Sequence, residues 1–244
     1  ADREIEEISR IFEERRGEVT GPLRVSAPVG VARHQFAPLI ARFAALHPGV
    51  QIELDVSDEV RDFAEGAVDV SLRILRPHDS SIIARPIAPL QALTLASPAY
   101  LKSAGTPMEP RELSQHRCIG YRHPDSGRIA DLHFRIGGKD VALPFEPTLV
   151  VNDVEAACEL AASGLGIAQP PSNYVASHLK NRLLVQILPR FTATPWHVYL
   201  CYPNRKKLPL RIRAFIDFGR DHLKRETFAR MNFDEERRTR RTTR

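Results

Sequence analysis

Apolar and polar positions alternate with two different periods in the first third of the chain. Runs typical of strands occur at 23–26, 50–56 and 68–74, and the second run, VQIELDV, alternates strictly. Residues 33–46 instead repeat apolar side chains at helical spacing. The core face of this helix is predicted to consist of Phe36, Leu39, Ile40, Phe43 and Leu46.

A second, shorter helix is predicted between the second and third strands. Ser57 or Asp58 is placed to cap it, and Gly66 is placed to end it. The resulting order is strand, helix, strand, helix, strand. That order implies a parallel sheet.

The second half of the chain repeats this alternation. Strands are predicted at 90–96, 118–121, 132–136, 148–151, 166–169 and 196–202. The pair Gly137-Gly138 before Val141 indicates a tight hairpin turn. A second α/β unit is therefore expected within the chain.

Helix signals in this half stand at defined positions. Asn152 and Glu155 have the spacing of a capping box, at the start of a helix that Gly164 ends. Ser172 is predicted to cap another helix, and residues 208–223 are predicted to form the last one.

The two ends of the chain differ from its middle. Residues 1–18 place Ile5, Ile8 and Phe12 on a short coiled-coil seam among seven acidic residues and four arginines. Two interpretations stay open: a helix packed on its own domain, or the end of a longer dimerisation helix. Residues 226–244 are basic and lack sustained periodicity, so we expect this tail to be disordered.

The composition is that of a globular protein. Of 244 residues, 43% are apolar and 27% charged, which excludes fibrous and wholly disordered classes. The longest apolar runs fall far short of the ~20 residues of a membrane helix, and the first residues lack the apolar core of a signal peptide. Three cysteines without a CxxC pair are typical of reduced thiols. We therefore expect a cytoplasmic protein that makes no membrane contact.

The net charge of +5 lies mostly in the tail. Residues 224–244 contain eight basic and four acidic side chains, which leaves the rest of the chain almost balanced. A surface that binds DNA needs clustered positive charge. The folded part therefore shows no charge pattern for nucleic acid.

Motifs of enzymes and metal sites are missing from the sequence. It contains no GxGxxG, GxxxxGK[ST], HExxH or GxSxG. His116, Cys118 and His123 stand close together, but ligands on one strand rarely complete a tetrahedral zinc site without a fourth partner. Cys118 and Cys158 lie far apart, and neither has an adjacent cationic run to lower its pKa. We predict no catalytic residue, no metal and no cofactor.

Seven stretches of the chain stand in a recognisable order and spacing. They are GPLRVSAP at 21–28, FAPLIARFAALHPGVQIEL at 36–54, AEGAVDVSLRI at 64–74, ASPAYL at 96–101, VND at 151–153, ASGLGIAQPP at 162–171 and LPLRIRAFIDF at 208–218. Together, over about residues 15–225, they resemble the effector-binding domain of LysR-type transcriptional regulators. No single stretch is diagnostic, but seven in register are strong evidence.

The resemblance implies an α/β, periplasmic-binding-protein-like fold, in which two α/β subdomains are joined by two crossover strands and a small effector binds in the interdomain cleft. Residues 21–95 and 196–225 would form subdomain I, and residues 96–195 subdomain II. Residues 1–18 look like the last turns of the family's dimerisation helix. The winged helix-turn-helix of the family is not in this chain, so promoter DNA would be reached only through that absent N-terminal domain. A homodimer or homotetramer is expected.

Candidate effector residues follow from the position of ligands in open parallel sheets, beyond the carboxyl ends of the strands. Those of subdomain I are Ser26, Ala27, Pro28, Val29, Ser57 and Arg73. Those of subdomain II are Tyr121, Arg122, Asn152, Asp153, Gln169 and Pro170. Helix N-termini and Arg73 could hold a carboxylate or another anion. The plainer alternatives are a turn hydroxyl at Ser26, helix capping at Asn152 and Asp153, and a solvated surface arginine at Arg73.

The sequence departs from the family pattern near the expected cleft. Leu75 replaces a familiar glycine, residues 76–78 replace a plainer loop, and Gln169-Pro170 stand where many members carry two aliphatic residues. The effector is therefore not inferred from a relative.

The sequence leaves three functions open. The leading one is the sensing and oligomerisation domain of a LysR-type regulator, in which an effector favours one closure of the subdomains, with a coupling of about 1–3 kcal/mol. The first alternative is a solute-binding receptor of a transport system. The second is an enzyme on a similar two-lobed scaffold, for which no paired acid and base are found.

Overall fold

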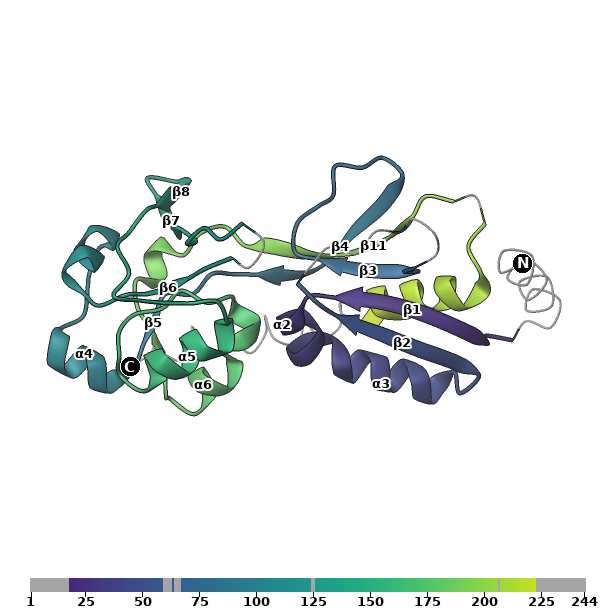
Figure 1. The fold of residues 1–244 in the computed structure, drawn as a ribbon, viewed down its shortest axis with the longest axis horizontal. Helices are drawn as coiled ribbons and strands as arrows, with labels where there is room; N and C mark the ends of the chain where they lie inside the picture. Colours follow the sequence, from purple (N-terminus) through teal and green to yellow (C-terminus); the bar gives the residue numbers. More distant parts are fainter. Residues whose placement is uncertain (1–17, 59–62, 64–66, 124–125, 206, 223–244) are drawn as a thin grey trace, which may run out of the picture. The chain divides into compact units, whose positions relative to one another are not determined.

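The chain is divided into two units in the computed structural model, which describes residues 18–58, 63, 67–123, 126–205 and 207–222 (Figure 1). Unit 1 lies within residues 1–89 and 197–244, and unit 2 consists of residues 90–196. The two boundaries fall at the end of β4 (Ile82–Leu90) and the start of β11 (Trp196–Pro203). The chain thus passes from unit 1 to unit 2 along β4 and returns along β11.

Unit 1 is built on a five-stranded mixed sheet in the order β2-β1-β3-β11-β4. β1 (Gly21–Ala27) pairs in parallel with β2 (Val50–Val56) and with β3 (Val70–Arg73). The parallel part predicted from the strand and helix alternation is therefore confirmed. β11 pairs with β3 in the antiparallel direction, which makes the sheet mixed.

One continuous helical stretch follows β1. It consists of α2 (Val29–Val31), a π-helical turn (Ala32–Phe36) and α3 (Ala37–Leu46). The predicted core face is largely confirmed, because Phe36, Leu39 and Phe43 are fully buried, whereas Leu46 is 62% exposed. Phe43 packs edge-on against Phe215, with ring centroids 5.0 Å apart. Phe215 belongs to the last described helix, residues 210–222, whose start is set by Pro209.

The strand predicted at 90–96 is wrong. Residues Ile82–Leu90 form β4 instead, and only Leu95–Ala96 form a short strand, β5. Pro86 and Pro89 lie within β4 and argue against a strand when the sequence is read alone. β4 is the outermost strand of its sheet, where a residue without an N–H leaves no neighbour unpaired.

Unit 2 contains several short extended segments that pair side by side. β6 (Ile119–Tyr121) pairs in parallel with β9 (Leu149–Val151), and Ile167 bridges to Cys118 in parallel on the other side. Ala168 bridges to Leu95 of β5, which pairs with β10 (Val185–Gln186). The strand predicted at 166–169 is thus reduced to two bridging residues in the middle of this array.

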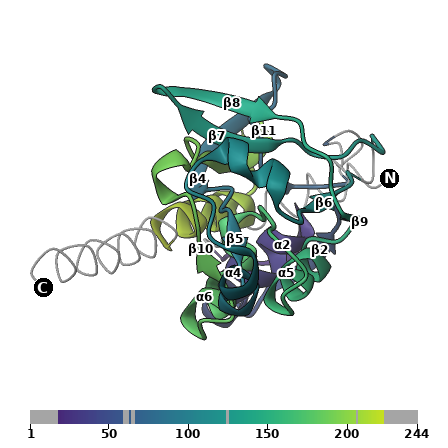
Figure 2. The same ribbon diagram turned by 90° about the vertical axis from the view of Figure 1, so that its left-hand side faces the viewer.

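A separate hairpin of unit 2 consists of β7 (Leu132–Ile136) and β8 (Lys139–Leu143) (Figure 2). Gly137 and Gly138 form its turn with φ of 59° and 80°. Two consecutive residues with positive φ are what a type I′ turn requires, so the predicted hairpin is confirmed.

The helices of unit 2 are short. They are α4 (Pro98–Ala104), the 3₁₀ turn η3 (Pro110–Gln115), α5 (Val154–Ala162), the 3₁₀ turn η4 (Ser172–Tyr174), α6 (Ala176–Lys180) and the 3₁₀ turn η5 (Pro189–Phe191). Ser172 does not cap a helix as predicted. It lies inside η4, and its hydroxyl accepts a hydrogen bond of 3.2 Å from the N–H of Gln91.

Several predictions fall outside the described residues. They concern the coiled-coil seam at 1–18, most of the short helix predicted between Ser57 and Gly66, and the tail after residue 222. Within the described ranges, no helix combines the length and apolar character that crossing a membrane requires.

Candidate functional site

The candidate residues of unit 1 meet where its three parallel strands end. Register pairs join Ala27 to Val56 and Ser26 to Ser71, and the N–H of Ser57 donates to the carbonyl oxygen of Ala27 at 3.1 Å. Pro28 and Val29 follow directly as the start of the helix. The predicted residues Ser26–Val29 and Ser57 therefore lie together at one edge of the sheet of unit 1.

Ser26 is a buried side chain, with 5% exposure. Its hydroxyl donates to the hydroxyl of Ser71 at 3.0 Å. Sequence reasoning missed Ser71, although a serine inside the apolar run VDVSLRI was a usable signal. Ser26 is thus part of a buried polar pair and is not an ordinary solvated turn hydroxyl.

The N-terminus of the helical stretch is occupied by a carboxylate of the chain itself. The N–H of Val29 donates to Oδ1 of Asp58 at 3.0 Å. A negative charge at this end of a helix is stabilised by the helix dipole. The N–H predicted to bind an anionic effector is therefore already engaged. Asp58 also belongs to this edge, although its sequence position indicated only a cap for the next helix.

Arg73 ends β3, and its guanidinium lies over the ring of Phe63, 5.3 Å from the ring centroid. Phe63 is buried, with 7% exposure. Stacking on an aromatic ring restricts the guanidinium plane, which suits an arginine to bidentate contact with a carboxylate. Arg73 is thus held by the fold and is not simply a solvated surface side chain.

The candidate residues of unit 2 also gather at one end of parallel segments. Tyr121 pairs in register with Val151, and the N–H of Arg122 donates to the Val151 carbonyl oxygen at 2.7 Å. Asn152 and Asp153 follow β9 directly. Gln169 and Pro170 follow the bridging residues 167–168, so all six predicted residues lie at the carboxyl ends of neighbouring extended segments.

Both polar atoms of the Gln169 side chain form hydrogen bonds within unit 2. Its Oε1 accepts from the N–H of His133 at 2.7 Å, and its Nε2 donates to the carbonyl oxygen of His133 at 3.0 Å and to Oγ1 of Thr94 at 2.9 Å. The side-chain amide thereby pairs with strand β7 as a backbone peptide would. Pro170 is buried, and its carbonyl oxygen accepts from the N–H of Leu93 at 3.0 Å. Thr94 and His133 had no local sequence signal.

The capping box predicted from Asn152 and Glu155 is wrong by one residue. Asp153 is the N-cap of α5, with φ of −128° and ψ of 127°, and its side chain accepts from the N–H of Ala156 at 2.7 Å. An extended residue directly before the first helical residue is the geometry of an N-cap. Asn152 is exposed, one position outside the cap.

Arg122 and Tyr121 place one charged and one aromatic side chain at this edge. Nη1 of Arg122 donates to the carbonyl oxygen of Gly127 at 2.7 Å, and the side chain is exposed. The ring of Tyr121 lies edge-on to that of His123, with centroids 5.1 Å apart. The edge therefore offers one cation and one aromatic surface.

Metal and thiol chemistry find no support in the described ranges. No group of three His, Cys, Asp or Glu side chains there could hold a metal ion. Nδ1 of His116 lies 3.2 Å from the hydroxyl of Tyr100. Burial raises the pKa of Cys118 and Cys201 to about 11 and that of Cys158 to about 12, so all three remain neutral thiols at physiological pH.

Comparison with known proteins gives consistent matches along most of the chain. The model of the LysR substrate-binding domain family matches residues 16–224. The chain is 30% identical over 223 residues to the uncharacterized HTH-type transcriptional regulator YhjC of Escherichia coli, covering 88% of this chain and 72% of that protein. It is 29% identical to the HTH-type transcriptional regulator PtxR of Pseudomonas aeruginosa, covering 87% of this chain and 68% of PtxR.

Solved structures agree with the sequence matches. The regulatory domain of CrgA from Neisseria meningitidis superposes with a TM-score of 0.72 at 27% identity, covering 84% of this chain and 99% of that domain. The regulatory domain of AphB from Vibrio vulnificus gives 0.69 at 25% identity, covering 82% and 98%. The resemblance, the fold class and the absence of enzymatic function predicted from the sequence are thereby confirmed. The chain belongs to the LysR substrate-binding domain family and is the effector-binding regulatory domain of a LysR-type transcription regulator.

Proposed function

We propose that this domain senses a small molecule through both groups of candidate residues, one in each unit. The observation that supports this most is the gathering of each group at the carboxyl ends of neighbouring strands. Open α/β sheets bind ligands beyond such ends. The sheet edge of unit 1 contributes Ser26–Val29, Ser57 and Arg73, and that of unit 2 contributes Tyr121, Arg122, Asn152, Asp153, Gln169 and Pro170.

The effector we propose carries an anionic group. The cations available for it are Arg73 of unit 1 and Arg122 of unit 2. The N–H of Val29 is a weaker candidate than the sequence implied, because the carboxylate of Asp58 already accepts from it. Asp58 would have to leave, or the effector's anion would have to be bound by arginine alone.

Regulation follows from unequal affinity for two conformations of the domain. An effector shifts such an equilibrium only by the difference between its two binding free energies. Couplings of this kind amount to about 1–3 kcal/mol, enough to change occupancy at a promoter several-fold. The effector therefore need not bind tightly to act as a signal.

LysR regulators bind effectors and DNA. We propose that promoter DNA is read in the bacterial cytoplasm through an N-terminal winged helix-turn-helix outside this chain, and that the regulator works as a homodimer or homotetramer. Light scattering on the purified chain should then give two or four times the mass of 27.5 kDa. A monomer at micromolar concentration would contradict assembly through this domain.

The experiment that tests sensing begins with the ligand. Native mass spectrometry of the domain purified from its own cells should show a retained metabolite, and calorimetry should then measure its affinity. Arg73→Gln and Arg122→Gln should each weaken binding at least about fivefold. The matched control is Arg220→Gln, a partly exposed arginine that forms salt bridges with Asp217 and Asp221. Unchanged affinity in both test variants would remove these sheet edges from the effector site.

A further inference from the structure

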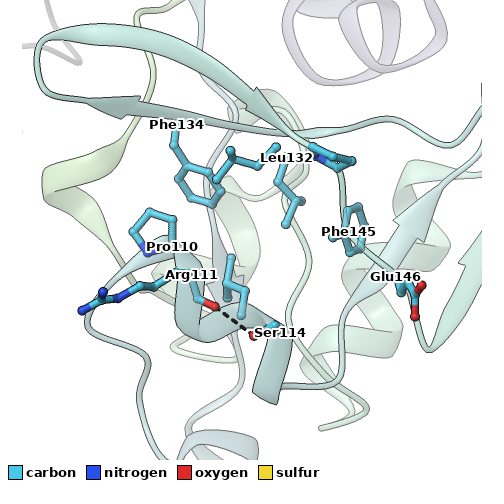
Figure 3. Close-up of a pocket in the computed structure, with 10 residues that line it drawn as sticks. Pro110, Arg111, Ser114, Leu132, Phe134, Phe145 and Glu146 are labelled. Atoms are coloured by element: carbon cyan, nitrogen blue, oxygen red, sulfur yellow. Dashed lines mark hydrogen bonds between the residues drawn. The ribbon is translucent and has the colours of Figure 1, made fainter.

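A pocket of about 530 Å³ lies within unit 2 (Figure 3). It opens between the 3₁₀ turn η3, strand β7 and the segment after β8. Seven of its ten lining residues are apolar. The polar ones are Arg111, Ser114 and Glu146.

The walls of this pocket are held in place by the fold. Leu132 and Phe134 are buried on β7, whereas the backbone of His133 between them is bonded to the amide of Gln169. The ring of Pro110 fixes φ on one side, and that of Pro144 does so on the other. A pocket with rigid walls needs little reordering when a ligand enters, which favours affinity. Its volume lies within the range of small-molecule sites.

The charges around the pocket are unequal. Nε of Arg111 lies 2.8 Å from a carboxylate oxygen of Glu109, and Figure 3 shows this guanidinium directed away from the pocket. Glu146 is exposed at the opposite side and forms no salt bridge with any residue that the structure describes. Among the charged lining residues, the charge of Arg111 is thus compensated by Glu109, whereas that of Glu146 is not compensated within the described part of the chain. A cation is therefore preferred over an anion at the mouth.

We propose that this pocket is a second ligand site, and that it takes a small aromatic molecule carrying a protonated amine. The ring would lie among Pro110, Phe134 and Phe145, and the ammonium would lie toward the carboxylate of Glu146. Aromatic walls and a carboxylate both favour a cation. No residue that lines the pocket belongs to either group of candidate effector residues, although Gln169 bonds the backbone of His133 between two of them.

The test uses three probes that share one ring and differ in charge: phenethylamine, 2-phenylethanol and 3-phenylpropionate. Each is titrated into the 244-residue chain at low salt, and amide signals are followed by NMR. Phenethylamine should bind with a dissociation constant on the order of 1 mM and shift signals in 110–114, 132–134 and 143–146. The carboxylate should bind at least about threefold more weakly, and this difference should shrink as salt is added.

Two variants locate the site. Ser114→Trp adds bulk at an exposed lining position and should weaken phenethylamine binding at least about tenfold, whereas Gln115→Trp adds the same bulk to the next exposed residue outside the pocket and should change it less than about twofold. Glu146→Gln should abolish the preference for the amine over the carboxylate while leaving the affinity for 2-phenylethanol unchanged.

Each other result overturns the proposal. Absence of binding, equal weakening by Ser114→Trp and Gln115→Trp, or tighter binding of the carboxylate would contradict it. Signals that move at Ser26–Val29 or at Asn152 and Asp153 instead would place the probe at the effector residues. None of these results would affect the proposed effector sensing, which is tested with a different ligand.

Discussion

The two candidate edges are held in place by different means. In unit 1, β1 pairs with β2 over seven residues and with β3 over two, and the second pairing brings Ser26 beside Ser71. In unit 2, β6 and β9 pair over three residues, and a side-chain amide, that of Gln169, completes the pairing along β7. The edge of unit 1 is therefore positioned by backbone pairing within one sheet, whereas the edge of unit 2 also depends on the side chain of Gln169.

The helix N-termini of the two edges show the same contrast. Each is met by an aspartate, but Asp153 directly precedes the helix that it caps, whereas Asp58 reaches Val29 from another segment of unit 1. Asp153 is therefore tied to the folding of α5, whereas a ligand could displace Asp58, which belongs to a separate segment from the helix that it contacts. Substitutions in unit 2 should consequently affect stability as well as binding, while those in unit 1 should separate the two.

Gln169→Leu should produce the largest loss of stability among the candidate residues. It removes three hydrogen bonds and leaves the N–H and carbonyl of His133 and the buried hydroxyl of Thr94 without their partner. Unsatisfied buried polar groups of this kind should lower the free energy of unfolding by about 3 kcal/mol. Urea denaturation measures the loss, with Gln115→Leu, at an exposed position, as the control. A loss equal to that of the control would show that the amide does not hold β7.

Alkaline pH should destabilise unit 2 more than unit 1. Unit 2 contains Cys118 and Cys158, whereas unit 1 contains Cys201, and burial raises the pKa of each thiol from 9.0 to about 11 or 12. Because the folded state favours the neutral thiol, this stabilisation is complete below pH 9 and is lost as the pH rises toward 11. At pH 10 each thiol should cost about 1.4 kcal/mol.

The measurement is the change in unfolding free energy between pH 8.5 and pH 10. Cys201→Ala should flatten this change by the contribution of one thiol, and the double substitution Cys118→Ala with Cys158→Ala should flatten it by two. Lysines and tyrosines titrate equally in all the variants, so their contribution cancels. An identical pH dependence in wild type and double variant would mean that the thiols are equally hydrated in the folded and unfolded states.

Periodicity predicted most of the fold because each strand and helix buries a regular set of side chains. β2 and β7 begin and end as predicted, and the glycine pair forms the predicted turn after β7, since alternation and a glycine pair are local signals. β4 was missed because its prolines argue against a strand. Its position at the sheet edge, where prolines are tolerated, depends on the tertiary structure and cannot be predicted locally. The exposure of Leu46, at the end of its predicted core face, is likewise decided by what packs nearby.

The candidate site was predictable only where strand ends define it. The rule that ligands lie at carboxyl ends correctly grouped residues within each unit. The partners of those residues were not predictable, because the bonds from Gln169 reach His133 and Thr94 across sequence separations of 36 and 75. Asp58 reaches Val29 across 29 residues for the same reason. Such contacts depend on the packing of the whole unit.

Asp153→Ala should cost about 1 kcal/mol, because it removes the N-cap of α5. The neighbouring substitution Asn152→Ala should cost less than about 0.3 kcal/mol, since that side chain lies outside the cap. Thermal unfolding of the two variants compares them directly, and hydrogen exchange in residues 154–162 locates the effect. A larger loss for Asn152→Ala would restore the capping box that the sequence suggested.

Asp58→Asn should have the smallest effect on stability and a clear effect on anions. The amide oxygen can still accept from the N–H of Val29, so the contact survives, while the negative charge at the helix N-terminus is lost. An anion approaching Ser26–Val29 then meets no repulsion, and benzoate, followed through the amide signals of these residues, should bind about threefold more tightly at low salt. The matched control is Asp79→Asn, because Asp79 also accepts from a backbone N–H, that of Ser81 at 2.8 Å, but not at a helix end. Equal benzoate affinity in the two variants would show that the charge of Asp58 does not repel anions from this edge. The difference between the displaceable Asp58 in unit 1 and the capping Asp153 in unit 2 would then be a difference in stability alone.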